Sequence, residues 1–212
     1  MKKSINLLEG PILPSLSGLA LPIMATSLIQ MAYNLTDMIW IGRVGSSAVA
    51  AVGAAGMYMW LANGLATLAK MGGQVKVAQA LGAKENKQAV SYAKSALQLG
   101  ITLGLIYGIL SVVLANPLID FFKLNSAKVV ADAKIYLQIT CGGVVFSFLN
   151  QIFTGIMTAM GNSRTSFVAT AVGLVINIVM DPVLIFGIGP FAEMGVMGAG
   201  VATVFAQMIV TA

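Results

Sequence analysis

The sequence predicts an all-α, polytopic membrane protein, and three observations lead to this prediction. Of the 212 residues, 58% are hydrophobic and only 9% are charged, and the mean hydropathy is +0.91. An ordinary soluble domain is about 45–50% apolar and about 25% charged. The hydrophobic residues also run along the whole chain. A soluble domain, a disordered chain and a domain on a single membrane anchor are therefore excluded.

The charged residues divide the chain into apolar intervals, such as those from Arg43 to Lys70 and from Lys94 to Asp120. A helix needs about 20 apolar residues to cross the hydrocarbon core of a bilayer. We therefore expect six spans, at residues 14–38, 48–71, 92–116, 134–158, 165–187 and 195–212. The last range is short and lacks a polar flank.

The basic residues predict the orientation of these spans, because cytoplasmic loops carry an excess of lysine and arginine. With a cytoplasmic N-terminus, the inner side holds Lys2, Lys3, Lys70, Lys76, Lys84, Lys87, Lys94 and Arg164. The outer side then holds Arg43, Lys123, Lys128 and Lys134. Six spans place both termini in the cytoplasm, and the protein is expected in the inner (plasma) membrane.

The start of the chain resembles a signal peptide only in its two lysines, Lys2 and Lys3. The apolar run that follows is too long and has no A-x-A site, so we expect the first span to be retained. The formal net charge of +5 comes from residues in short loops, which indicates membrane topology rather than a nucleic-acid partner.

The residue inventory excludes several kinds of site. The chain has one cysteine, Cys141, and no histidine. A disulfide framework within the chain, a Cys/His metal site and a histidine-dependent nucleophilic site are therefore excluded. We expect no enzyme, no catalytic residues and no cofactor.

Two acidic residues lie inside the predicted spans, Asp37 in the first and Asp181 in the fifth. A charge at mid-membrane costs at least about 2.5–3.5 kcal/mol, so such residues persist when they pair, bind an ion or stay protonated. Lys70 is placed at the cytoplasmic end of the second span, too far away to pair with either acid. A proton or a metal cation is therefore the expected partner of both acids.

Polar neighbours lie at helical spacing from Asp181. Asn177 is four residues earlier and shares its helix face. Pro182 has no N–H group, so the carbonyl of Ile178 loses its helical donor. An oxygen-rich site for a hard cation, or a water-filled pocket, would result.

The first predicted span has a similar arrangement. Tyr33 and Asp37 are four residues apart, and Gln30 lies one turn before Tyr33. Pro22 lies inside the span and is expected to bend it.

Each of these residues also has a structural interpretation. Asp37 could be solvated at the membrane surface near Trp40 and Arg43, and Asp181 could bind backbone donors or cap a broken helix. Hydrogen bonds between helices are the simpler role of Asn63, Asn150 and Gln151. The 13 methionines suit core packing or lipid contact, with the adaptable wall of a promiscuous drug site as the alternative.

Five segments resemble the multidrug and toxic compound extrusion (MATE) family in order and spacing, and together they span nearly the whole chain. They are YNLTDMIWIG at 33–42, LGAKEN at 81–86, AMGNSRT at 159–165, NIVMDPVLIFG at 177–187 and GAGVAT at 198–203. They resemble the family's first helix, its two cytoplasmic loops, its fifth helix and its sixth helix.

The resemblance implies a secondary antiporter that exports small organic cations in exchange for inward H⁺ or Na⁺ flow. It implies a twelve-helix fold made of two six-helix lobes around a central cavity. Residues 1–212 would form the N-terminal transmembrane lobe, and the C-terminal lobe is absent from this chain.

The resemblance also implies roles for individual residues. The ion-coupling residues, which are also the possible Na⁺ ligands, would be Asp37, Asn177, Asp181 and Thr203. The supporting polar residues would be Gln30, Tyr33, Asn34 and Asn150. Pro22 would be where the first helix bends, and Pro182 is the corresponding position in the fifth span.

Two further interpretations remain open at this point. A lipid-linked sugar flippase of the same superfamily would carry more cationic residues in its cavity, whereas the spans here carry acids and no arginine. A non-transporting fragment or structural membrane subunit is the other alternative. The sequence does not decide between H⁺ and Na⁺.

Overall fold

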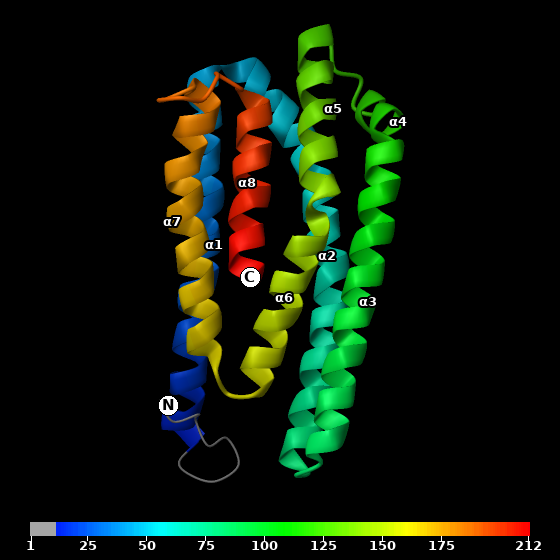
Figure 1. Ribbon diagram of the computed structural model, residues 1–212, viewed down its shortest axis with the longest axis vertical. Coiled ribbons are helices and arrows are strands. Elements are labelled where there is room, and N and C mark those ends of the chain that lie inside the picture. Colours follow the sequence, from blue (N-terminus) through cyan, green and yellow to red (C-terminus); the bar gives the residue numbers. More distant parts are fainter. Residues whose placement is uncertain (1–11) are drawn as a thin grey trace.

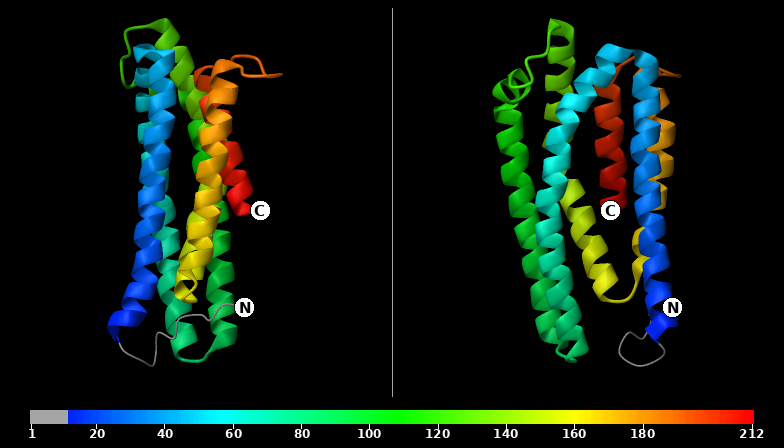
Figure 2. Two further views of the ribbon diagram at one scale, coloured as in Figure 1. Left: turned by 90° about the vertical axis from the view of Figure 1, so that its left-hand side faces the viewer. Right: turned by 180° about the vertical axis from the view of Figure 1, so that it is seen from behind.

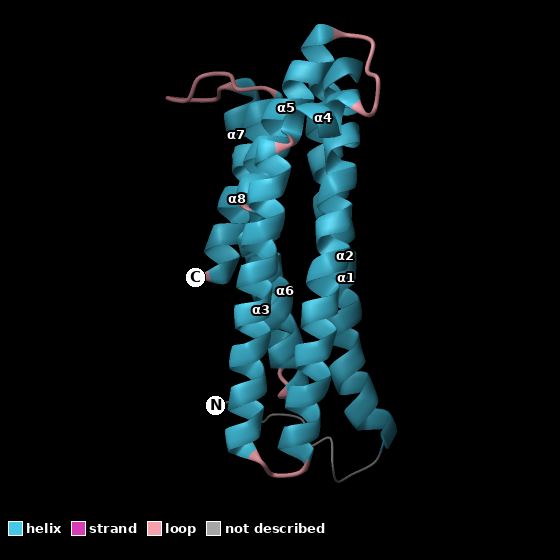
Figure 3. Cartoon of the chain, turned by 90° about the vertical axis from the view of Figure 1, so that its right-hand side faces the viewer, coloured by secondary structure: helices cyan, strands magenta, loops and turns pink. Residues whose placement is uncertain are grey.

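The computed structural model describes residues 12–212, which form helices and connecting loops with no strand among them, as Figure 3 shows. The predicted all-α class is therefore confirmed. Lys2, Lys3 and Glu9 lie outside the described residues. The helices are α1 (Ile12–Val44), α2 (Ser46–Gly82), α3 (Asn86–Val113), α4 (Ala115–Asp120), α5 (Ala127–Gly142), α6 (Val144–Ala159), α7 (Ser163–Phe186) and α8 (Val196–Thr211).

Four of the described helices, α1, α2, α3 and α7, are long and apolar enough to cross a membrane. The pair α5 and α6 bends by 45° and would make a fifth span if both halves belong to one crossing. The α8 helix has 16 residues, fewer than the roughly 20 that a full crossing needs. The count of six spans stays a prediction.

The range 134–158, predicted as one span, is divided between α5 and α6. The break falls at Gly143, beside the last residue of α5, Gly142. Two successive glycines weaken a helix, because they add backbone entropy to the unfolded chain and nothing to packing. A β-carbon at Gly143 would overlap the Val204 side chain of α8, so the bend brings these helices into close contact.

The α2 helix extends well beyond the predicted end of the second span at residue 71. It ends at Gly82, so Lys70 lies 12 residues, or about 18 Å, before the end of the helix. The helix therefore extends beyond the predicted span, and the placement of Lys70 at the cytoplasmic end of that span stays a prediction. A lysine interrupts a hydropathy pattern, but it is a good helix former and does not end a helix.

The helices form two groups that the eighth helix joins. α1 and α7 lie side by side, while α2 packs against α3 and α6, and α8 lies between α7 and α5 (Figures 1 and 2). Gly45 connects α1 to α2 with a φ of 139°, a conformation that glycine adopts readily and other residues do not.

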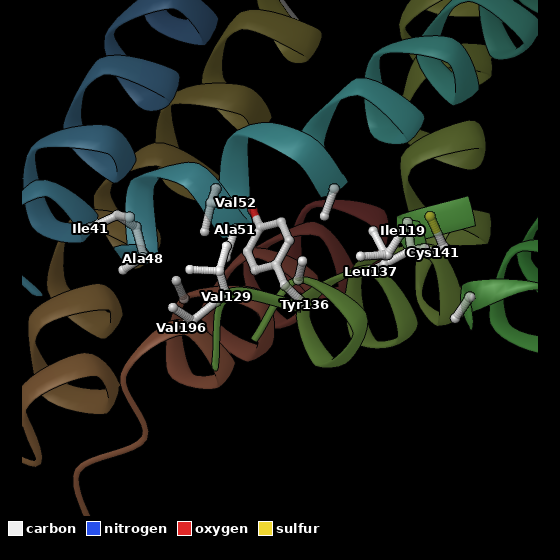
Figure 4. Close-up of a cluster of buried hydrophobic side chains, with 14 of the residues drawn as sticks. Ile41, Ala48, Ala51, Val52, Ile119, Val129, Tyr136, Leu137, Cys141 and Val196 are labelled. Atoms are coloured by element: carbon white, nitrogen blue, oxygen red, sulfur yellow. The ribbon is translucent and has the colours of Figure 1, made fainter. Parts of the chain in front are cut away.

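A hydrophobic core fills the end of the bundle where α1 meets α2 (Figure 4). Its members include Ile41 of α1, Ala51 of α2, Leu137 of α5 and Val196 of α8. Small alanines on α2 allow this close helix packing. The core also includes Ile185 of α7, so it fixes the relative positions of α1, α7 and α8, which hold the polar residues described next.

Candidate functional site

Asp37 of α1 and Asp181 of α7, far apart in sequence, are adjacent in the structure. Their exposed fractions are 8% and 0%, and the two carboxyl groups lie within electrostatic range of each other. Two carboxylates repel each other when both are charged. The pair is therefore stable when a proton or a cation compensates at least one negative charge.

The other two predicted ion-coupling residues lie with this pair. Asn177 is fully buried and donates a hydrogen bond from Nδ2 to Oδ1 of Asp181, at 3.1 Å. Thr203 of α8 lies beside Tyr33 of α1, and Tyr33 is within electrostatic range of both carboxyl groups. The structure thus brings together five residues, which we call the polar cluster: Tyr33, Asp37, Asn177, Asp181 and Thr203.

The polar cluster holds an unusual number of buried oxygen atoms that have no hydrogen-bond partner. Seven buried side-chain N or O atoms have no hydrogen-bond partner in the described part of the chain, and five of them belong to the cluster. They are Tyr33 Oη, Asp37 Oδ1, Asn177 Oδ1, Asp181 Oδ2 and Thr203 Oγ1. Such atoms are rare in folded proteins, because each costs about 1–3 kcal/mol when left unpaired.

No basic side chain compensates the cluster within residues 12–212. The salt bridge found in this region joins Lys134 to Asp120 at 3.1 Å, near the surface. The described residues also contain no group of three or more Cys, Asp or Glu side chains that would hold a metal ion. The cluster combines two acids with neutral oxygens, a donor set that suits a proton or a small hard cation.

The structural interpretations of the two acids do not fit this geometry. Asp37 is buried rather than solvated, and Arg43 instead lies over the Trp40 ring, 4.8 Å from its centroid. Asp181 caps no broken helix, because α7 continues through Pro182 to Phe186.

Gln30, Tyr33, Asn34 and Asn150 all line a cavity of about 740 Å³ between α1, α2, α6, α7 and α8. Tyr33 alone among these four belongs to the polar cluster as well. The cavity and the cluster therefore share a side chain.

Asn150 connects two helices. Its Nδ2 donates to the carbonyl oxygen of Gln207 at 3.0 Å, and its Oδ1 accepts from Thr211 Oγ1 at 2.8 Å. Gln151 Nε2 likewise donates to Asn63 Oδ1 at 3.0 Å. The prediction that these amides form hydrogen bonds between helices is confirmed, although their side chains also form part of the cavity wall.

The two prolines lie inside helices that continue past them. Pro22 is 15 residues before Asp37, or about 22 Å along the axis. Its carbonyl oxygen accepts a hydrogen bond from Thr26 Oγ1 at 2.8 Å. Bending of α1 at Pro22 would move the first part of the helix relative to the polar cluster, and it stays a prediction.

Sequence reasoning missed Tyr136. This residue of α5 is 5% exposed and lies within electrostatic range of Tyr33, Asp37 and Asp181. A tyrosine in an apolar stretch gives no sign of its partners, and α5 is not next to α1 in sequence. Only the three-dimensional packing reveals that Tyr136 adjoins the acids.

The MatE family profile matches residues 22–183, more than half of the chain. A probable multidrug resistance protein, NorM, from Thermotoga maritima is 31% identical over 191 residues, which are 90% of this chain and 41% of that protein. An FAD transporter from Shewanella oneidensis is 25% identical over 211 residues, which are 99% of this chain and 46% of that protein.

The fold matches solved structures of transporters as well. A MOP superfamily transporter from Pyrococcus furiosus, whose reverse polarity of the binding pocket is said to suggest a different function, superposes with a TM-score of 0.91 at 26% identity. The match covers 100% of this chain and 46% of that one. The chain thus spans less than half the length of the proteins it resembles. It belongs to the MATE family of multi-pass membrane transporters.

Proposed function

We propose that this chain is the ion-coupling lobe of a secondary antiporter, which exports small organic cations in exchange for H⁺ or Na⁺. The observation that supports this proposal best is the set of five unpaired oxygens around Asp37 and Asp181. A proton or Na⁺ would satisfy several of them at once and would compensate the negative charge. The lobe would act in the plasma membrane together with a second six-helix lobe, with both ends of the present chain in the cytoplasm.

Ion binding and cargo binding compete in this mechanism. With H⁺ or Na⁺ bound, the two carboxyl groups are neutralised, α1 and α7 can stay in contact, and a cationic solute loses its electrostatic attraction. Without the ion, the negative cluster attracts the solute. The differential affinity of two states for two ligands is what couples one flow to the other.

Tyr33 gives this competition a physical path. Its ring lines the cavity, and its hydroxyl group lies beside Thr203 and near both acids. A change of charge at the polar cluster therefore acts directly on a residue of the cavity wall, with no other residues needed to connect the two. Bending of α1 at Pro22 would narrow the cavity further.

The proposal is tested by solute export in inverted membrane vesicles from cells that express the protein. We expect Asp37→Asn and Asp181→Asn to lower ion-driven export by about tenfold or more, since coupling energies of 1–3 kcal/mol correspond to factors of about 5–150. Asp120→Asn is the matched control, because this acid is paired with Lys134 at the surface. If Asp37→Asn still exports solute with ion coupling intact, the proposal is wrong.

A further inference from the structure

The charged side chain on the wall of the cavity is a lysine. Lys70 of α2 is half-buried and lies among neutral polar side chains, those of Asn63, Thr67, Gln151 and Thr154. No acidic residue lies among the described residues that line this cavity. The cavity wall of this lobe is therefore positively charged, although the nearby polar cluster is acidic.

The packing of α2 against α6 holds Lys70 at this place. A β-carbon added to Gly155 of α6 would lie 2.9 Å from Cγ of Lys70 and 3.2 Å from its carbonyl oxygen. The apolar stem of the side chain is thus packed against α6. Lys70 also lines the cavity, which is the arrangement of long basic side chains that bury their stems and leave the charged end in a polar space.

No carboxylate pairs with Lys70 within residues 12–212, where the salt bridge joins Lys134 to Asp120. Lys70 lies inside α2, at the level of Gly155 in the last part of α6, and lines the cavity. Lys84, in contrast, lies in the turn between α2 and α3, and Lys87 lies in the first turn of α3. A basic group inside a transmembrane segment usually pairs with another group or marks a substrate path.

We propose that Lys70 binds an anionic group, a carboxylate or a phosphate, of the solute in the cavity. The cargo of this transporter is then zwitterionic: its cationic part competes with the coupling ion, and its anionic group binds the Lys70 ammonium. The cationic half of this statement rests on the proposed function. The anionic half rests on the cavity wall alone.

Two dyes that share one cationic ring system test the proposal. Rhodamine B carries a free carboxylate, whereas rhodamine B ethyl ester does not. We would measure the binding of each dye by fluorescence anisotropy, with the purified protein in nanodiscs of phosphatidylcholine. We expect wild-type protein to bind the carboxylate form about tenfold more tightly, the factor typical of a hydrogen bond to a charged group.

Three variants test whether Lys70 causes the preference for the dye with the free carboxylate. Lys70→Met keeps the length of the side chain and should abolish the preference, while Lys70→Arg keeps the charge and should retain it. Lys76→Met, which removes an exposed lysine from the same helix, should leave it unchanged. A repeat with phosphatidylglycerol in the nanodiscs tests whether a lipid phosphate is the ligand instead.

Equal binding of both dyes to wild-type protein, or an unchanged preference in Lys70→Met, would overturn the proposal. So would a finding that Lys70 affects only the binding of phosphatidylglycerol. Failure of the coupling mechanism is distinguishable, because it would appear as an absence of competition between ion and dye while the Lys70-dependent preference persists.

Discussion

At the residue scale, two acids are buried with no basic partner among residues 12–212. Asp37 and Asp181 could be singled out from the sequence, because charged residues are rare inside apolar spans and their polar neighbours stand at helical spacing. Tyr136 and the cavity position of Lys70 could not. The first depends on packing between distant helices, and the second depends on the packing of α2 against α6.

Replacing Asp181 with asparagine should stabilise the protein when no coupling ion is present. The amide keeps an acceptor for Asn177 Nδ2 and removes one negative charge from the buried pair. We expect the melting temperature at pH 8 in Na⁺-free buffer to rise by about 2–4 °C, which corresponds to about 1 kcal/mol for a chain of this size. A thermal unfolding assay in detergent measures this change.

The matched control for this prediction is Asp120→Asn. Asp120 is largely exposed and its ion pair with Lys134 is at the surface, so its loss should change stability by at most about 1 kcal/mol. A lower melting temperature for Asp181→Asn than for wild type would show that the carboxylate itself stabilises the fold.

At the element scale, hydropathy located the helices but not their ends or their break. The range 165–187 matches α7 within two residues at each end, whereas α3 begins six residues before the predicted 92 and ends three residues before the predicted 116. The α1 and α2 helices extend beyond the predicted spans, because both helices continue past a charged side chain. The division at Gly143 has a local sign, the two successive glycines, and it also reflects contact with α8, which no local pattern contains.

The close contact between α7 and α8 requires glycine, which has no side chain, at position 198. A β-carbon at Gly198 would lie 2.6 Å from the carbonyl oxygen of Leu184, and this backbone atom cannot move without displacing α7. We expect Gly198→Ala to lower the free energy of unfolding by about 1–3 kcal/mol. The shift in melting temperature relative to wild type measures the effect.

Gly53→Ala is the control, because it is the same kind of substitution at a position without a close helix contact. No atom lies within 4 Å of a β-carbon at Gly53 in α2. Alanine should therefore stabilise this helix by up to about 1 kcal/mol. Equal effects of the two substitutions would contradict the close approach of α7 and α8.

At the scale of the whole molecule, the composition and the order of the motifs were enough for the membrane class and the family. The arrangement of α1 beside α7, with α8 between the two helix groups (Figure 1), could not be worked out from local patterns. It is this arrangement that unites residues 33–37, 177–181 and 203 into one cluster. The orientation in the membrane follows only from the distribution of basic residues.

Labelling of single cysteines tests that orientation. In a Cys141→Ala background, we expect Lys128→Cys, in the first turn of α5, to react with a membrane-impermeant maleimide in intact cells. Lys87→Cys, at the start of α3, should react only after the cells are permeabilised, because the α2–α3 turn is cytoplasmic under the positive-inside rule. The reverse pattern would invert the topology.

The central claim is that the polar cluster binds the coupling ion in competition with the cargo. The most direct measurement is the affinity for rhodamine B ethyl ester, a cation, as Na⁺ replaces choline at constant ionic strength and, separately, as the pH is lowered. The account predicts that Na⁺ or acid weakens binding to the wild-type protein and that Asp37→Asn and Asp181→Asn remove this dependence. An affinity that neither ion changes, or a dependence that survives both substitutions, would contradict it.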